Sequence, residues 1–312
     1  MSRHAKHLRA ISLAICSALL AFPTHANDAS PAIQPVDQTR KSHIDTITVE
    51  AERDRKTIER QVNAFVSGIA VAPRDQSLAN WQTSVPLCPL VAGMPHDDGE
   101  YMLAHISKIA KAAGAPLAAE HCRPNFYVIV TSEVNALFKA WGRRDPTMFG
   151  DAGGTLIHKF LNSSTPVRAW YNADIYNSDG TPLGNGDNQG SFDISQARVN
   201  LRAEATRIRF NEVRDLGSVI VIIDAPRARG ITFGQLAAYV AMIGLAEIRI
   251  DARASDAPSS ILQLFAASGK VPPPGLSAWD EAFLKALYHT EHLNQHQIAA
   301  VKTAMVGEIA PH

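Results

Sequence analysis

Apolar and polar residues follow two different periods along this chain. Apolar side chains recur every three to four positions in 54–69 and 101–113, which predicts amphipathic helices, and Gly114 marks the end of the second. Residues 126–131 and 218–224 are short apolar runs rich in β-branched side chains, which predict buried strands. The second run is apolar on both faces, so we expect it in the interior of a sheet.

Shorter segments give weaker signals. Brief alternation or β-branched composition predicts strands at 47–51, 167–171 and 207–210. Residues 78–94 show no period, which predicts a loop, and the glycine-rich segment 178–191 is typical of a flexible loop. Helices and strands in this order predict an α+β fold: a twisted mixed sheet packed on helices, with a helical N-terminal segment and a small helical C-terminal part.

The N-terminus has the pattern of an export signal. Basic residues precede an apolar stretch at 10–22, and Thr24-His25-Ala26 resembles a cleavage site, so we predict a signal peptide at 1–26 and a periplasmic or secreted protein. Cys16 leaves lipidation as an alternative, although Ile15 fits a lipobox poorly. No apolar run reaches the length of a membrane span, so we expect no stable membrane insertion after signal removal.

The segment after the signal is divided by composition and by cysteine. Polar residues at 27–45 predict a flexible leader. We predict a helical N-terminal region at 46–122, joined by a disulfide between Cys88 and Cys122, and an α+β domain at 123–309. A periplasmic environment is oxidising, which favours the disulfide over a metal or redox pair, and the chain has no Cys-x-x-Cys.

Three landmark segments give the chain a resemblance to a known family. A helix rich in small residues leads into Gly244-Leu245-Ala246-Glu247, a turn follows at Ser260-Ile261-Leu262, and a last helix opens at Trp279-Asp280 and closes at Leu287-Tyr288. They are similar to the His-Glu-x-x-His-x-x-Gly-Leu-x-His helix, the Ser-Ile-Met turn and the final helix of metzincin-type zinc proteases. Residues 123–290 also resemble a group of uncharacterised exported proteobacterial proteins.

This resemblance implies a zincin-like fold without its zinc site. In zincins a twisted sheet lies against two helices, of which the second carries the metal ligands, and a smaller C-terminal part follows. Counting from Gly244, the two ligand positions fall on Ala237 and Ala241, the general base on Ala238 and the third ligand on Glu247. Methyl groups cannot coordinate zinc or activate water, so the resemblance implies a degenerate zincin with no cofactor. An unrelated buried helix explains the same residues.

Three histidines offer a different site. His289, His292 and His296 are close in sequence, and the last two have the i, i+4 spacing that suits zinc. Their neighbours are polar, so a solvated helix surface is the other interpretation.

The net charge and the alanines at the aligned zinc-ligand positions restrict the functional hypotheses. Thirty basic and thirty acidic residues give zero net charge, which does not favour nucleic-acid binding. We expect a non-catalytic, exported zincin-like protein that binds a peptide or an envelope protein as an added strand beside the active-site helix. The alternative is a metal-dependent hydrolase with a displaced site around His289, His292 and His296. A structural envelope component is a third possibility.

Overall fold

The computed structural model describes residues 38–70, 78–144, 148–150, 154–177, 212–249, 259–266, 271–291 and 296–310. The predicted signal peptide, the loop at 178–191, the strand at 207–210 and His292 lie outside these residues. Residues 1–47 and 48–312 form two units; α1 begins in the first, and all later elements belong to the second.

The described residues contain seven α-helices, one short 3₁₀ helix and one four-stranded sheet. In chain order the elements are α1 (Gln38–Ile69), β1 (Pro89–Ala92), α2 (His96–Ala113), β2 (Phe126–Thr131), α3 (Val134–Arg144), α4 (Gly154–Leu161), β3 (Val167–Asn177), β4 (Glu212–Asp224), α6 (Phe233–Leu245), η1 (Ile261–Gln263), α7 (Ala278–His289) and α8 (Gln297–Ile309). No helix in these ranges has both the length and the apolar character needed to cross a bilayer.

The sheet is mixed, with strand order β1-β2-β4-β3. β1 and β2 are parallel, β2 and β4 are parallel, and β3 runs antiparallel to β4. The interior position of β4 confirms the prediction from its uninterrupted apolar run. The mixed sheet packed on helices is also as predicted.

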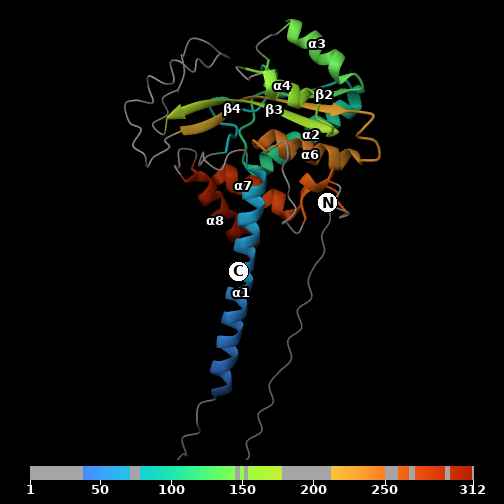
Figure 1. The fold of residues 1–312 in the computed structure, drawn as a ribbon. Helices are drawn as coiled ribbons and strands as arrows, with labels where there is room; N and C mark the ends of the chain where they lie inside the picture. The colour runs from blue at the N-terminus through green and yellow to red at the C-terminus, as the bar shows by residue number, and fades with distance from the viewer. Residues whose placement is uncertain are drawn as a thin grey trace, which may run out of the picture. The chain divides into compact units, whose positions relative to one another are not determined.

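Helices cover both faces of the sheet (Figure 1). Val219, Val221 and Ile223 of β4 belong to the main core on the side of α2 and α6, whereas Ile220 and Ile222 belong to a smaller core beneath α3 and α4. Alternate side chains of a strand point to opposite faces, so a strand buried on both sides must be apolar throughout. α7 and α8 lie on the far side of α2 and α6 (Figure 1).

The C-terminal half of α1 is part of the main core. Its predicted apolar stripe includes Val62, Phe65, Val66 and Ile69, none of which is exposed to solvent. The ring of Phe65 makes edge contacts with Trp279 and Phe283, whose centroids lie 5.9 and 6.1 Å away. The periodic pattern at 54–69 therefore predicted this helix and its buried face.

Two local predictions were wrong. Residues 47–51, predicted as a strand, are helical within α1, where Glu52 and Lys56 form an i, i+4 pair at 2.8 Å one turn further along. Five alternating residues are too few to outweigh a helix that continues on both sides. The leader predicted at 27–45 stays a prediction: residues 27–37 lie outside the described residues, and α1 begins at Gln38.

The second error concerns β1. Residues 78–94 were predicted as a loop, but Pro89–Ala92 form a strand that pairs with β2. This strand is only four residues long and begins with a proline, which has no N–H to donate, so its sequence resembles a loop. Pairing with a distant segment creates the strand, and β1 and α2 thereby belong to the same sheet and helical layer as the elements after residue 123.

The predicted disulfide is confirmed. Cys88 lies just before β1 and Cys122 precedes β2, and the two Cα atoms are 6.1 Å apart. Asn125 reinforces the same junction, because its Oδ1 accepts from the Cys88 N–H at 2.7 Å and its Nδ2 donates to the Pro86 carbonyl at 3.0 Å. Covalent and hydrogen bonds thus hold the start of β1 against the start of β2.

Candidate functional site

α6 is the helix on which the zincin resemblance places the ligand positions. It begins with a capping box, in which the Thr232 side chain accepts from the Gln235 N–H and the Gln235 side chain accepts from the Thr232 N–H. From Leu236 to Leu245 only Tyr239 is not fully buried. A helix that is apolar around its whole circumference is an interior element, and α6 packs between the sheet, α2 and α7.

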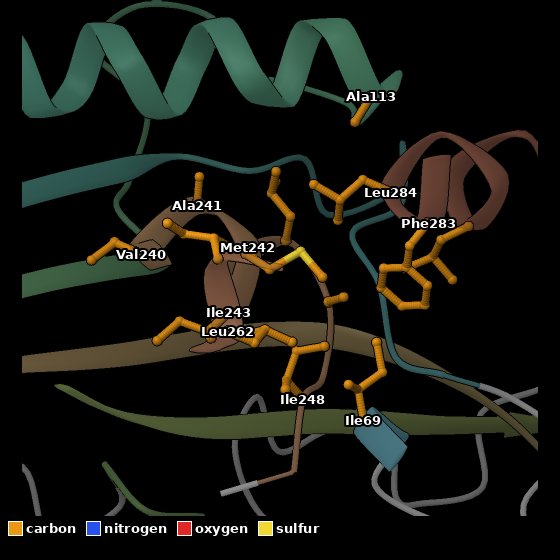
Figure 2. Close-up of a cluster of buried hydrophobic side chains, with 14 of the residues drawn as sticks. Ile69, Ala113, Val240, Ala241, Met242, Ile243, Ile248, Leu262, Phe283 and Leu284 are labelled. Atoms are coloured by element: carbon orange, nitrogen blue, oxygen red, sulfur yellow. The ribbon is translucent and has the colours of Figure 1, made fainter. Parts of the chain in front are cut away.

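The three positions that the resemblance aligns with two zinc ligands and the general base lie in the core. Ala237, Ala238 and Ala241 are 0%, 1% and 0% exposed. Figure 2 shows Ala241 inside a cluster of apolar side chains that also includes Met242 of the same helix and Phe283 of α7. These positions have neither metal-binding atoms nor access to solvent, so they cannot support zinc hydrolysis.

Glu247, the position aligned with the third zinc ligand, has a different partner. Its side chain is 7% exposed, and Oε1 lies 2.7 Å from Nη2 of Arg214 on β4. A buried carboxylate paired with a guanidinium is held in one place, and its charge is already matched. The structure therefore assigns Glu247 an ion pair between the end of α6 and the sheet.

Three aromatic side chains bind the last carbonyl groups of α6. The Tyr171 hydroxyl donates to the Ile243 carbonyl at 2.8 Å, the Trp81 indole N–H donates to the Gly244 carbonyl at 2.8 Å, and the Tyr288 hydroxyl donates to the Leu245 carbonyl. The final carbonyls of a helix lack partners within the helix. Burial raises the pKa of both tyrosines, so both hydroxyls stay protonated and able to donate.

Gly244 has a packing role at the same helix end. A Cβ built on this residue would lie 2.1 Å from Cζ of Phe126, which is fully buried on β2. The missing side chain lets the helix approach the sheet at this point. The glycine of the Gly-Leu landmark is thus explained by its contact with β2.

Replacing Gly244 by alanine is expected to lower the free energy of unfolding by about 1 to 3 kcal/mol, because the added methyl group overlaps the Phe126 ring. Gly234→Ala, at the start of the same helix, is the matched control. Its nearest contact would be an ordinary 3.7 Å, so higher helix propensity should leave the protein unchanged or slightly more stable. Urea unfolding of both variants tests this, and equal effects would contradict the packing role.

The Ser-Ile-Leu turn is bonded to the beginning of α7 through Asp280, which is fully buried. Its carboxylate accepts from the Ser260 hydroxyl at 2.6 Å, the Ile261 N–H at 2.8 Å, the Ser277 N–H at 2.9 Å and the Ser277 hydroxyl at 2.8 Å. Burial raises the pKa of Asp280, and these hydrogen bonds oppose that shift. One side chain therefore fixes the position of η1 relative to α7.

The landmark segments consequently touch one another in two places. Asp280 binds the Ser260 turn, and Tyr288 binds the carbonyl of Leu245. Trp81 and Tyr171, which complete the end of α6, were not recognised in the sequence. They lie 163 and 72 residues from their acceptors, and no local pattern connects residues so far apart.

A small pocket opens between β3 and the side of α6. It has a volume of about 40 Å³, and its walls include Val167, Ala169, Tyr171, Tyr239 and Ile243. We call it the edge pocket. Burial raises the pKa of Tyr239 to about 12, so this hydroxyl is neutral at ordinary pH.

The edge pocket and the two alanines aligned with zinc ligands, Ala237 and Ala241, are on opposite sides of α6. Ala237 and Ala241 each lie two residues from Tyr239, and two residues correspond to about 200° of rotation in an α-helix. Tyr239 and Ile243 line the pocket, whereas the two alanines face the core. The residues of α6 that line the edge pocket are therefore Tyr239 and Ile243, and not the aligned ligand positions Ala237 and Ala241.

β3 presents one row of backbone groups away from the sheet. Along β3, residues whose N–H and C=O groups face β4 alternate with residues whose groups face away from it. The Asp224 N–H donates to the Pro166 carbonyl at 2.8 Å, so Pro166 is a residue that faces β4. Val167, Ala169 and Tyr171 then direct their N–H and C=O groups to the outer edge. Within the ranges that the structure describes, β4 is the only strand paired with β3.

The histidine site stays a prediction. His289 and His296 are both exposed, and the His289 ring nitrogen Nδ1 lies 2.8 Å from the Lys285 carbonyl. His292 lies outside the described residues. Among the residues that can be placed, no three His, Cys, Asp or Glu side chains gather as metal ligands would.

The described surroundings of α6 thus supply apolar contacts and backbone hydrogen-bonding groups. The positions aligned with the first two zinc ligands are alanines in the core, and Glu247 forms an ion pair with Arg214. Comparisons of the chain with protein-family models, with curated proteins and with solved structures found no match.

Proposed function

We propose that this chain is an exported, non-catalytic zincin-like protein that binds an extended segment of a peptide or envelope protein along β3. The observation that carries the proposal is the outward row of backbone groups on β3 directly beside the edge pocket. Strand addition needs such a row, and alternate side chains of the added strand need a pocket. Both lie on the same side of α6.

The zincin-like part of the proposal is supported by the arrangement of the landmarks. The sheet lies against two helices, α2 and α6, and the second of these carries the aligned positions. A smaller helical part, α7 and α8, follows, and it is joined to α6 through Tyr288 and to the Ser260 turn through Asp280. The burial of Ala237 and Ala241 departs from a zincin, in which the ligands face the cleft.

A non-catalytic role is supported by the chemistry of the edge pocket. The residues of α6 that line it are Tyr239 and Ile243. Ile243 cannot bind metal, and a tyrosine with a pKa of about 12 is a poor base at neutral pH. The remaining walls combine apolar residues with Thr165, Arg168 and Arg249.

The size of the pocket restricts the bound segment. A volume of about 40 Å³ can hold a small group only, so the side chain that enters it should be of the size of alanine or valine. In an added strand, residues two apart point to the same face. We therefore propose that the bound segment has a small residue opposite Ala169.

Ala169→Pro is expected to abolish partner binding without unfolding the protein. The outward N–H of Ala169 makes no hydrogen bond to a described residue, and proline is tolerated at an edge-strand position whose N–H faces away from the sheet. The ring removes one donor and blocks the approaching strand, so binding should weaken by about tenfold or more. The measurement is recovery of a specific protein from envelope extract with the tagged full chain.

Ala169→Ser is the control for this experiment, because it keeps the N–H and nearly the same volume. It should recover the same protein as the wild type, and circular dichroism should show that both variants remain folded. Recovery of no specific protein by the wild type would contradict the proposal. So would undiminished recovery by a folded Ala169→Pro variant.

A further inference from the structure

A second cavity lies at the carboxyl ends of β2 and β4. These strands are adjacent and parallel, yet β2 leads to α3 on one face of the sheet and β4 leads to α6 on the other. In open α/β sheets the chain diverges at such a switch point and leaves a crevice where ligands bind. The cavity occupies this crevice and has a volume of about 300 Å³.

The walls of the cavity are mostly polar. They include Ser132 and Asn135 near the start of α3, Ser163 after α4, and the charged residues Arg168 and Arg227. The cavity is about as large as the smallest ligand sites of proteins, and Arg168 is a wall residue of both this cavity and the edge pocket.

Arg168 is the central residue of this cavity. Its side chain is only 4% exposed. Nη1 donates to the Leu161 carbonyl at 2.6 Å and more weakly to the Phe160 carbonyl at 3.4 Å, and Nε donates to the Thr165 carbonyl at 3.4 Å. Nη2 makes no hydrogen bond to a described residue, and its acidic neighbour Asp224 Oδ2 is 3.8 Å away. Within the described residues, Nη2 of this buried guanidinium thus has one long ion pair and no hydrogen bond.

Two guanidinium groups and two carboxylates line the cavity. Oδ2 of Asp224 lies 3.4 Å from Nε of Arg227 and 3.8 Å from Arg168, so one carboxylate serves two guanidinium groups. Burial lowers the pKa of Arg168, the charge of Arg227 lowers it further, and Asp224 opposes both effects. Glu133 also lines the cavity, but its side chain is exposed and solvated. Around Asp224, two guanidinium groups therefore face a single carboxylate, and Glu133 supplies the second negative charge of the lining.

We propose that this cavity binds a small molecule through one oxyanionic group, a carboxylate or a phosphate. The oxyanion contacts Nη2 of Arg168 and the guanidinium of Arg227, and the start of α3 adds the positive end of a helix dipole. The Ser132 hydroxyl also lines the cavity and is a further donor there, whereas the Ser163 hydroxyl is hydrogen-bonded to Thr165 Oγ1 at 2.8 Å. Arg168 lines both this cavity and the edge pocket, whereas Arg227 and Asp224 line this cavity alone.

Calorimetric titration of the oxidised full chain with succinate and with inorganic phosphate, at constant ionic strength set by chloride, tests the proposal. We expect saturable binding of at least one of the two, and the tighter one identifies the oxyanion. Arg227→Gln should weaken this binding by about tenfold or more, since a charge-assisted hydrogen bond is lost. Arg227 is half exposed, so its replacement should not disturb folding.

Arg229→Gln is the matched control, because Arg229 is an exposed arginine of the same turn that does not line the cavity. It removes the same charge two residues away and should leave binding within about twofold of the wild type, as screening weakens distant surface charges. Absence of saturable binding of either anion would overturn the proposal. Equal weakening by the two variants would also overturn it, since only general charge attraction would then be at work.

Discussion

Asp280→Ala is expected to lower the free energy of unfolding by about 3 kcal/mol or more. The change leaves the Ser260 hydroxyl and two backbone N–H groups without their acceptor, whereas the Ser277 hydroxyl can still donate to the Ser259 carbonyl at 2.9 Å. Each buried donor that loses its partner costs about 1 to 3 kcal/mol, although water entering the space can recover part of this loss. Removing a buried charge offsets a further part of the loss, so the expected loss of unfolding free energy is smaller than the summed cost of the unpaired donors.

Glu281→Ala provides the control for Asp280. Glu281 is in the same first turn of α7 and is exposed, so it has the same favourable position near the helix N-terminus without the buried contacts. Its removal should cost about 0.5 kcal/mol. Chemical denaturation followed by far-ultraviolet circular dichroism measures both variants. A cost for Asp280→Ala as small as that of Glu281→Ala would show that the four hydrogen bonds do not stabilise the fold.

Loss of the Cys88–Cys122 disulfide is expected to lower the free energy of unfolding by about 3 to 4 kcal/mol. The bridge spans 34 positions of sequence, and closing a loop of that length reduces the entropy of the unfolded chain by a corresponding amount. The bridge also holds β1, whose four residues pair only with β2 among the described strands. We therefore expect the edge of the sheet at β1 to be the part most affected.

Replacing both cysteines by serine, and separately reducing the wild type, gives two measurements of the same quantity. Urea unfolding curves of the two should agree, and a reductant should have no effect on the double variant. A difference of less than about 1 kcal/mol between oxidised and reduced wild type would indicate that the loop is already restricted in the unfolded state.

The strongly periodic segments of the fold were predictable from sequence. The stripe that includes Val62 and Ile69, and the apolar runs of β2 and β4, identify their own burial because the period of each matches its secondary structure. β1 was not predictable, since four residues starting at a proline contain no period and depend on β2 for their hydrogen bonds. The helical conformation of 47–51 depends on neighbouring turns in the same way.

The candidate site was predictable only in part. The sequence showed that Ala237 and Ala241 cannot hold zinc, and this conclusion depends on chemistry alone. Which side of α6 faces the edge strand depends on how the helix is rotated against the sheet, and that rotation follows from contacts such as Gly244 with Phe126. The cavity at Arg168 requires three separate chain segments to meet, which local patterns cannot show.

The aromatic side chains at the end of α6 have a consequence for local motion. A helix terminus usually frays because its last turn can exchange internal bonds for water at little cost. Here Tyr171, Trp81 and Tyr288 come from three different parts of the chain, and each would have to withdraw before that turn could loosen. We therefore expect that the last turn of α6 does not unfold by itself. Its unfolding should occur together with the separation of β3, the segment before β1 and the C-terminal helices from one another.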